Sequence, residues 1–184
     1  MDLQLTDKII IIDLEATCWE GDTSYQKEHS EIIEIGICSL DVDTGAIEAK
    51  SGLLVKPVNS EISEFCTKLT TITPAMVAAE GISLKEAAAI IKEEYNSQNF
   101  TWASYGAYDK SMLKEQCQKF DIDYPMSSNH INVKVLLSEK LGLSKGIGMK
   151  AALKRLKLPL NGTHHRGVDD AYNIARIMNW ILKN

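Results

Sequence analysis

The 184-residue sequence lacks the features that mark several common classes of protein. Its four cysteines form no Cys-x-x-Cys pair, which excludes zinc-knuckle and thioredoxin motifs and indicates reduced thiols. No apolar run approaches the ~18 residues of a membrane-spanning helix. The first ten residues have neither the basic start nor the long apolar core of a secretory signal. We therefore expect a cytoplasmic protein without a membrane partner.

Internal repeats, low-complexity tracts and linkers rich in proline or glycine are also missing, so nothing divides the chain. Because a domain takes roughly 100–200 residues, we expect residues 1–184 to form a single domain. The shares of hydrophobic residues (45%) and charged residues (24%) are ordinary for a globular protein. They exclude a disordered or fibrous chain.

An excess of positive charge is absent as well, because the net charge is −5. This value argues against a polycation that holds nucleic acid by bulk charge. The charge is uneven, however, since residues 1–139 carry 11 basic and 23 acidic side chains and residues 140–184 carry 9 and 2. The basic segment is either a solvated face rich in lysine or a surface that meets an anionic partner locally.

Hydrophobic patterning predicts strands first and then strands alternating with helices, which is typical of an α/β protein with a mixed sheet. The first strand is apolar on both faces, as in a central strand, and the first three strands should form a meander. We expect strands at 8–14, 31–40, 47–55 and 100–105, a short apolar stretch at 131–137, and helices at 84–95, 109–119, 149–157 and 167–182. Ser83 and Glu86 have the spacing of a capping box for the first of these helices.

Two carboxylates, Asp13 and Glu15, close the first predicted strand. Because side chains alternate along a strand, residues two apart point to the same face. Two buried carboxylates repel each other unless a cation or hydrogen-bond donors compensate, and Mg²⁺ or Mn²⁺ suits oxygen ligands. The alternative is a solvated strand end.

Two later elements carry further polar candidates. Asp109 stands at the start of a predicted helix, where an acidic residue also stabilises the helix N-terminus. His165 precedes Asp170 by the same spacing as His164 precedes Asp169. Helix phase favours Asp170 as the buried carboxylate and His165 as its partner. The more exposed stripe, which contains Asp169, also holds Asn173 and Arg176.

The ordered set of an Asp-x-Glu strand, a middle Asp and a His-x₄-Asp helix resembles the DnaQ-like 3′→5′ exonucleases, in the histidine-containing branch of the DEDD superfamily. Further segments are similar to the exoribonuclease group that trims histone mRNA and small interfering RNA ends. These segments read DLEATCWE, HSEIIEIG, EFCTKLTTIT, INVK and HHRGVDDAYNIARI. The similarity covers about residues 8–180. It implies a ribonuclease H-like mixed five-stranded sheet flanked by helices.

The resemblance also implies a hydrolytic site with two divalent metal ions, Mg²⁺ or Mn²⁺. By this analogy Asp13, Glu15 and Asp170 hold one ion, and Asp13 and Asp109 serve the second. His165 would accept the proton of the attacking water, because a histidine titrates near neutral pH. The product would be a nucleoside 5′-monophosphate released from the 3′ end.

For the substrate, the resemblance assigns base stacking to Phe65 and Tyr108 and backbone contacts to Leu14 and Ala16. Core packing is the alternative for the two aromatic residues. The expected partner is the 3′ end of single-stranded RNA or of an overhang, bound by a monomer or a homodimer. A DNA exonuclease with the same site stays open as an alternative. So does a non-catalytic RNA-binding protein, although such a degenerate nuclease should have lost a metal ligand, and none is missing here.

Overall fold

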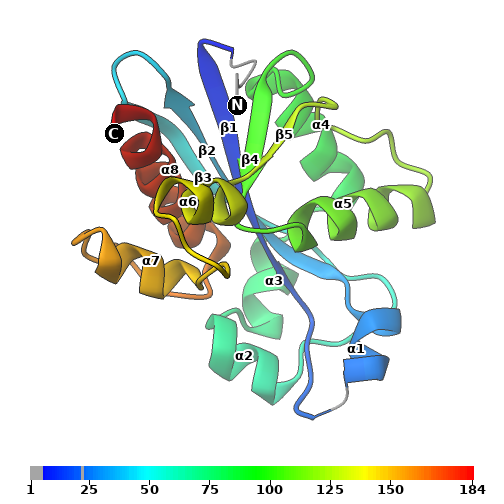
Figure 1. Cartoon of the computed structure of the whole chain (residues 1–184). Helices are drawn as coiled ribbons and strands as arrows, with labels where there is room; N and C mark the ends of the chain where they lie inside the picture. Colours follow the sequence, from blue (N-terminus) through cyan, green and yellow to red (C-terminus); the bar gives the residue numbers. More distant parts are fainter. Residues whose placement is uncertain (1–5, 22) are drawn as a thin grey trace.

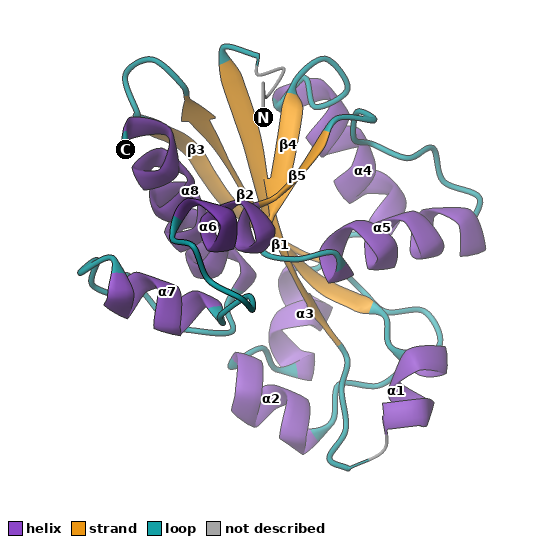
Figure 2. Cartoon of the chain, in the orientation of Figure 1, coloured by secondary structure: helices purple, strands orange, loops and turns teal. Residues whose placement is uncertain are grey.

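A mixed five-stranded sheet with eight helices makes up the part of the chain that the computed structural model describes, residues 6–21 and 23–184 (Figures 1 and 2). The strands are β1 (Lys8–Ala16), β2 (Ile32–Asp41), β3 (Ile47–Leu54), β4 (Thr101–Ser104) and β5 (His130–Asn132), in the order β3-β2-β1-β4-β5. Strands β1, β2 and β3 pair antiparallel, whereas β4 pairs parallel with β1 and with β5. The predicted meander, central first strand and mixed sheet are confirmed.

The helices are α1 (Thr23–His29), α2 (Glu64–Thr70), α3 (Pro74–Glu80), α4 (Leu84–Glu94), α5 (Tyr108–Lys119), α6 (Val133–Lys140), α7 (Met149–Arg155) and α8 (Gly167–Lys183). At the start of α4, the side chain of Ser83 accepts from the Glu86 backbone N–H and that of Glu86 accepts from Ser83, which confirms the predicted capping box. Among the described residues, no helix is long and apolar enough to cross a membrane.

Three short helices were not predicted, and one predicted stretch is divided. Helices α2 and α3 begin at side-chain caps, Ser63 and Thr73, and Pro74 occupies the first turn of α3. The stretch at 131–137 was expected as a single short segment, but it changes from β5 to α6 at Asn132. The Asn132 side chain accepts a hydrogen bond from the backbone N–H of Val135 and so caps α6.

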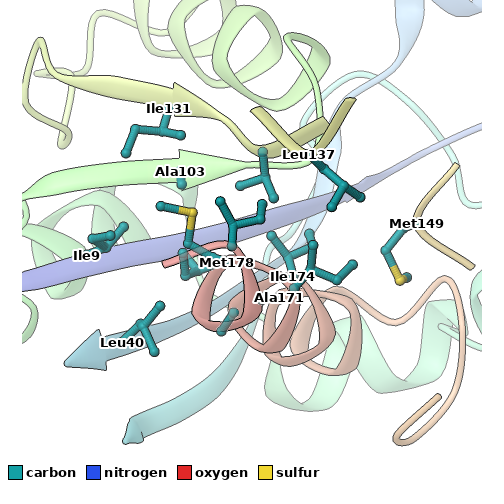
Figure 3. Close-up of a cluster of buried hydrophobic side chains, with 14 of the residues drawn as sticks. Ile9, Leu40, Ala103, Ile131, Leu137, Met149, Ala171, Ile174 and Met178 are labelled. Atoms are coloured by element: carbon teal, nitrogen blue, oxygen red, sulfur yellow. The ribbon is translucent and has the colours of Figure 1, made fainter. Parts of the chain in front are cut away.

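The two faces of the sheet are covered by different helices (Figure 1). Ile9 and Ile11 of β1 pack with buried residues of α6, α7 and α8, such as Leu137, Met149 and Ile174 (Figure 3). The even-numbered β1 residues Ile10, Ile12 and Leu14 pack instead with α4 and α5. Because side chains alternate, the next odd-numbered residues, Asp13 and Glu15, continue the face that α8 covers.

Candidate active site

Three of the predicted carboxylates meet where β1 passes the start of α8. Asp13 and Glu15 on β1 and Asp170 on α8 each offer a carboxylate oxygen, and these oxygens all lie within 4.8 Å of one another. Glu15 and Asp170 are 8% and 4% exposed. Glu15 is therefore buried, which excludes the alternative of a solvated strand end for this residue. The structure therefore brings together side chains that are 155 to 157 positions apart in the sequence.

The start of α8 reaches this position because its backbone packs directly on β2. Gly36 pairs with Asp13 across the two strands, and a Cβ atom at Gly36 would lie 1.8 Å from the backbone of Gly167. Glu34, fully buried beside this contact, accepts hydrogen bonds from the Gly167 N–H at 2.7 Å and from the Arg166 guanidinium at 3.1 and 3.2 Å. A buried ion pair and a glycine contact thus hold the first turn of α8 against the sheet.

Burial and mutual repulsion make these carboxylates reluctant to ionise together. Burial, followed by the charges of Asp170 and Glu34, raises the pKa of Glu15 to about 8. Burial also raises the pKa of Asp13, with Asp109 and Glu15 as the next largest causes. The pKa of Asp170 is raised by burial too, although its hydrogen bonds oppose the shift. A cation placed among them would relieve this repulsion.

The fourth predicted carboxylate, Asp109, adjoins the cluster from α5. It is 6% exposed, and its Oδ1 accepts a hydrogen bond of 3.1 Å from the backbone N–H of Leu14, between Asp13 and Glu15. The pKa of Asp109 is raised by burial, a shift opposed by hydrogen bonds that include one from the Ser104 hydroxyl. Asp109 is therefore hydrogen-bonded to the backbone of β1, so stabilising the helix N-terminus is not its only contact.

His165 was expected to be the partner of Asp170, but it contacts Asp170 through its backbone, and the side-chain partner is His164. The backbone N–H of His165 and the Nδ1 of His164 each lie 2.9 Å from Asp170 Oδ2. Their rings stack with centroids 3.9 Å apart, and His165 has a φ of +65°, an unusual backbone conformation for a residue with a side chain. Burial is the main cause that lowers the pKa of His165, and it favours the neutral ring that a proton acceptor needs.

The donor set fits a divalent metal ion. Asp170 Oδ1 is buried and has no hydrogen-bond partner among the described residues, although buried carboxylate oxygens are normally paired. The cluster that it shares with Asp13 and Glu15 contains only oxygen donors. Hard ions such as Mg²⁺ and Mn²⁺ prefer such ligands. A bound ion would give Asp170 Oδ1 the partner that the described residues do not supply.

The residues predicted to contact substrate occupy two different environments. Phe65 on α2 and Tyr108 on α5 are 37% and 58% exposed, so core packing does not account for them. Phe65 lines a surface cavity of about 480 Å³ with Glu20 and with residues of the same helix. Leu14 is buried and its N–H is already bonded to Asp109, while the carbonyl of Ala16 lies 3.5 Å from Cys66 Sγ. Contact of these four residues with a nucleotide stays a prediction.

One expectation about a neighbouring polar residue is wrong. Asn173 was placed on an exposed stripe with Asp169, but it is fully buried, and its amide Nδ2 donates to the Asn161 carbonyl. The reason is that the loop before α8 folds back over the helix and covers this side. Lys150 is exposed at the start of α7, and its charge contributes to the lowered pKa of His165.

The sequence did not reveal the residues whose hydrogen bonds hold the elements of the site in place. Glu34 and Arg166 are 132 positions apart in the sequence. Their ion pair supports the site because Glu34 lies opposite Glu15 in the pairing of β1 with β2. Ser104, which bonds Asp109, lies 2.9 Å from Nε2 of His130, and burial lowers the pKa of His130 to about 4. The sequence signals that could have located the supporting residues were small side chains and an acidic residue within an apolar run, as in EIIEIG.

Comparison with known proteins agrees with this geometry. The chain is 32% identical over 180 residues to human 3′-5′ exoribonuclease 1, an alignment covering 93% of this chain and 51% of that protein. It is 33% identical over 181 residues to human ERI1 exoribonuclease 3, covering 92% and 52%. The chain thus spans about half the length of these curated relatives.

A solved structure of the nuclease domain of 3′hExo, described as a DEDDh family member bound to rAMP, superposes with a TM-score of 0.83 at 30% identity. The superposition covers 100% of this chain and 94% of that one. The family model described as "Exonuclease" matches residues 10–178. This chain belongs to that exonuclease family, whose histidine-containing DEDD branch implies divalent metal ions at the carboxylate site.

Proposed function

We propose that this chain is a metal-dependent 3′→5′ exoribonuclease that hydrolyses phosphodiester bonds from the 3′ end of single-stranded RNA or of an overhang. The observation that carries the proposal is the buried cluster of Asp13, Glu15 and Asp170, in which Asp170 Oδ1 lacks a partner among the described residues. Relatives of this family named exoribonucleases, at 32–33% identity, support RNA as the substrate.

Each side chain has a role that its position supports. Asp13, Glu15 and Asp170 would hold one ion, and Asp13 with Asp109 would serve a second, either Mg²⁺ or Mn²⁺. Divalent ions supply electrostatic stabilisation of the negative charge that develops on the phosphate as water attacks in line. His165, kept neutral by its lowered pKa, would accept the proton of that water.

Binding of the RNA end would rest on stacking rather than on reading of sequence. The exposed rings of Phe65 and Tyr108 would stack on bases, an interaction worth ~1–3 kcal/mol per base that every base can make. Exposed lysines of the basic segment, such as Lys150, would face the phosphates. Arg166 is unsuited to that task because its guanidinium is bonded to Glu34. This arrangement predicts that the protein binds a short stretch at one strand end, with an affinity that falls as the salt concentration rises.

We also infer a cytoplasmic location. The four cysteines, all of which lie within the described part of the chain, are free thiols. Free thiols persist most readily in a reducing compartment.

The proposal is tested with 5′-labelled RNA and DNA strands of one sequence, incubated with Mg²⁺, Mn²⁺ or EDTA. We expect a ladder that shortens from the 3′ end of the RNA with either metal and is absent with EDTA. A circular RNA of the same sequence should stay intact because it has no end. Equal or faster shortening of the DNA would overturn the assignment to RNA, and binding of RNA without hydrolysis would overturn the assignment to catalysis.

A further inference from the structure

His164 contacts two members of the proposed site through its side chain, although no catalytic role was assigned to it. Its Nδ1 lies 2.9 Å from Asp170 Oδ2, and its ring stacks on His165 with 26° between the planes. An ionised carboxylate only accepts hydrogen bonds, so Nδ1 carries the proton in this contact. The side chain is 29% exposed, which leaves it free of the tight packing of the core.

The contact determines how the Asp170 carboxylate is turned. Oδ2 accepts two hydrogen bonds, from His164 Nδ1 and from the His165 backbone N–H, both at 2.9 Å. Oδ1 accepts none from the described residues, and Asp170 belongs to the cluster with Asp13 and Glu15. The last torsion of an aspartate side chain is broad and roughly two-fold, so a single donor constrains it less than two. With both donors, one oxygen is held by the protein and the other is left for the ion.

We propose that His164 is a positioning residue, whose Nδ1–H fixes the Asp170 carboxylate in the orientation that binds the metal ion. The inference rests on the proposed function only in taking Asp170 as a metal ligand. Hydrogen bonds to a ligating carboxylate are known to affect metal affinity by about 10- to 100-fold. We expect the lower end of that range, because the His165 backbone N–H still holds Oδ2 when His164 is replaced.

Two substitutions separate the hydrogen bond from the ring. His164→Phe keeps an aromatic ring beside His165 and removes the donor. His164→Asn removes the ring but keeps an N–H donor, since the amide nitrogen of asparagine is as many bonds from Cβ as Nδ1 of histidine. His29→Phe is the matched control, because His29 lies exposed on α1, where its Nδ1 contacts the Tyr25 carbonyl and its ring stacks on Tyr25.

The primary measurement is Mn²⁺ affinity of the full chain, by calorimetry without RNA. We expect His164→Phe to weaken Mn²⁺ binding about tenfold, His164→Asn to restore it to within about threefold of the wild type, and His29→Phe to leave it unchanged. In RNA trimming, His164→Phe should raise the Mn²⁺ concentration for half-maximal rate by the same factor. The KM for RNA should stay within about twofold, because His164 supports a ligand and does not touch the substrate.

The outcomes separate this inference from the proposed function. If His164→Phe binds Mn²⁺ as tightly as the wild type, or if His164→Asn binds as weakly as His164→Phe, the positioning role is wrong. If the wild type binds Mn²⁺ but does not shorten RNA, the proposed function fails, while the two variants still decide the role of His164. Absence of Mn²⁺ binding by the wild type would overturn both. Thermal melting of each variant verifies that the compared proteins are folded.

Discussion

Substitution of Gly36 by alanine should separate the two halves of the carboxylate cluster. A Cβ atom there would lie 1.8 Å from the backbone of Gly167, whereas ordinary van der Waals contact begins near 3.4 Å. The first turn of α8 must therefore retreat by about 1.6 Å, because backbone atoms cannot rotate aside. This shift carries Asp170 away from Asp13 and stretches the 2.7 Å hydrogen bond from the Gly167 N–H to Glu34.

The expected cost follows from the displacement. A misplacement of ~1 Å in a catalytic site can reduce the rate about 10²-fold, so kcat/KM for RNA should fall by about that factor or more. Overpacking typically lowers the free energy of unfolding by about 1–3 kcal/mol. Rates of 3′-end trimming and urea unfolding curves measure the two effects.

The control for this substitution is Gly148→Ala at the N-terminus of α7. A Cβ atom there meets no heavy atom of the described chain within 4 Å, and the φ of −67° is ordinary. Both rate and unfolding midpoint should stay near those of the wild type. If Gly36→Ala also keeps its rate within a few-fold and its urea midpoint, the close contact between β2 and α8 does not position Asp170.

Three further predictions concern individual side chains. Replacing His165 with alanine should lower kcat by about 10²–10⁴-fold and leave Mn²⁺ affinity nearly unchanged; an equal or greater loss of kcat in a His164 variant would mean that the proton acceptor is the other histidine. In the metal-free protein, the pKa of Glu15 is about 8 against an ordinary value of 4.5, so the folded state retains a proton that the unfolded state releases between these values. Stability should therefore fall as pH rises from about 4.5 to 8, by roughly 1.4 kcal/mol per unit at most for this group, and Mn²⁺ should remove the trend; melting temperatures that are flat with pH would contradict it. Phe65→Ala should raise the KM for RNA about tenfold, as loss of ~1–3 kcal/mol of stacking implies, whereas Val58→Ala, at a residue 71% exposed, should not; equal KM values would show that Phe65 does not bind the RNA.

The sheet and its long helices could be predicted from the sequence because their signals are local. Four consecutive isoleucines predicted a strand buried on both faces, and β1 is the middle strand of the sheet. Helices α2 and α3 were missed because each spans only seven residues, too few to show a clear hydrophobic period. Helix α7 is equally short but was predicted, because Pro159 marks where it must end. The caps at Ser63 and Thr73, with Pro74 after the second, were the signals that could have located them.

The residues of the candidate site likewise include some that local sequence patterns indicate and others that depend on tertiary structure. Strand alternation placed Asp13 and Glu15 on one face and helix phase favoured Asp170, but the family resemblance was needed to choose them as one site; the structure brings them together. The support from Glu34 depends on the register between β1 and β2, which no local pattern specifies. The contact of His164 with Asp170 depends on how the loop turns at His165, where φ is +65°. The spacing of residues in the sequence does not predict that turn.

The proposed function requires that carboxylates from β1 and α8 bind the metal ions used in hydrolysis. The most direct measurement is Mg²⁺-dependent trimming of 5′-labelled RNA by Asp13→Asn and Asp170→Asn, compared with Asp123→Asn at a side chain that is 93% exposed. Each of the first two variants removes one charge from the cluster and should lose trimming, while the third should keep it. Hydrolysis at the wild-type rate by Asp13→Asn or Asp170→Asn would show that these carboxylates do not bind the ions used in hydrolysis.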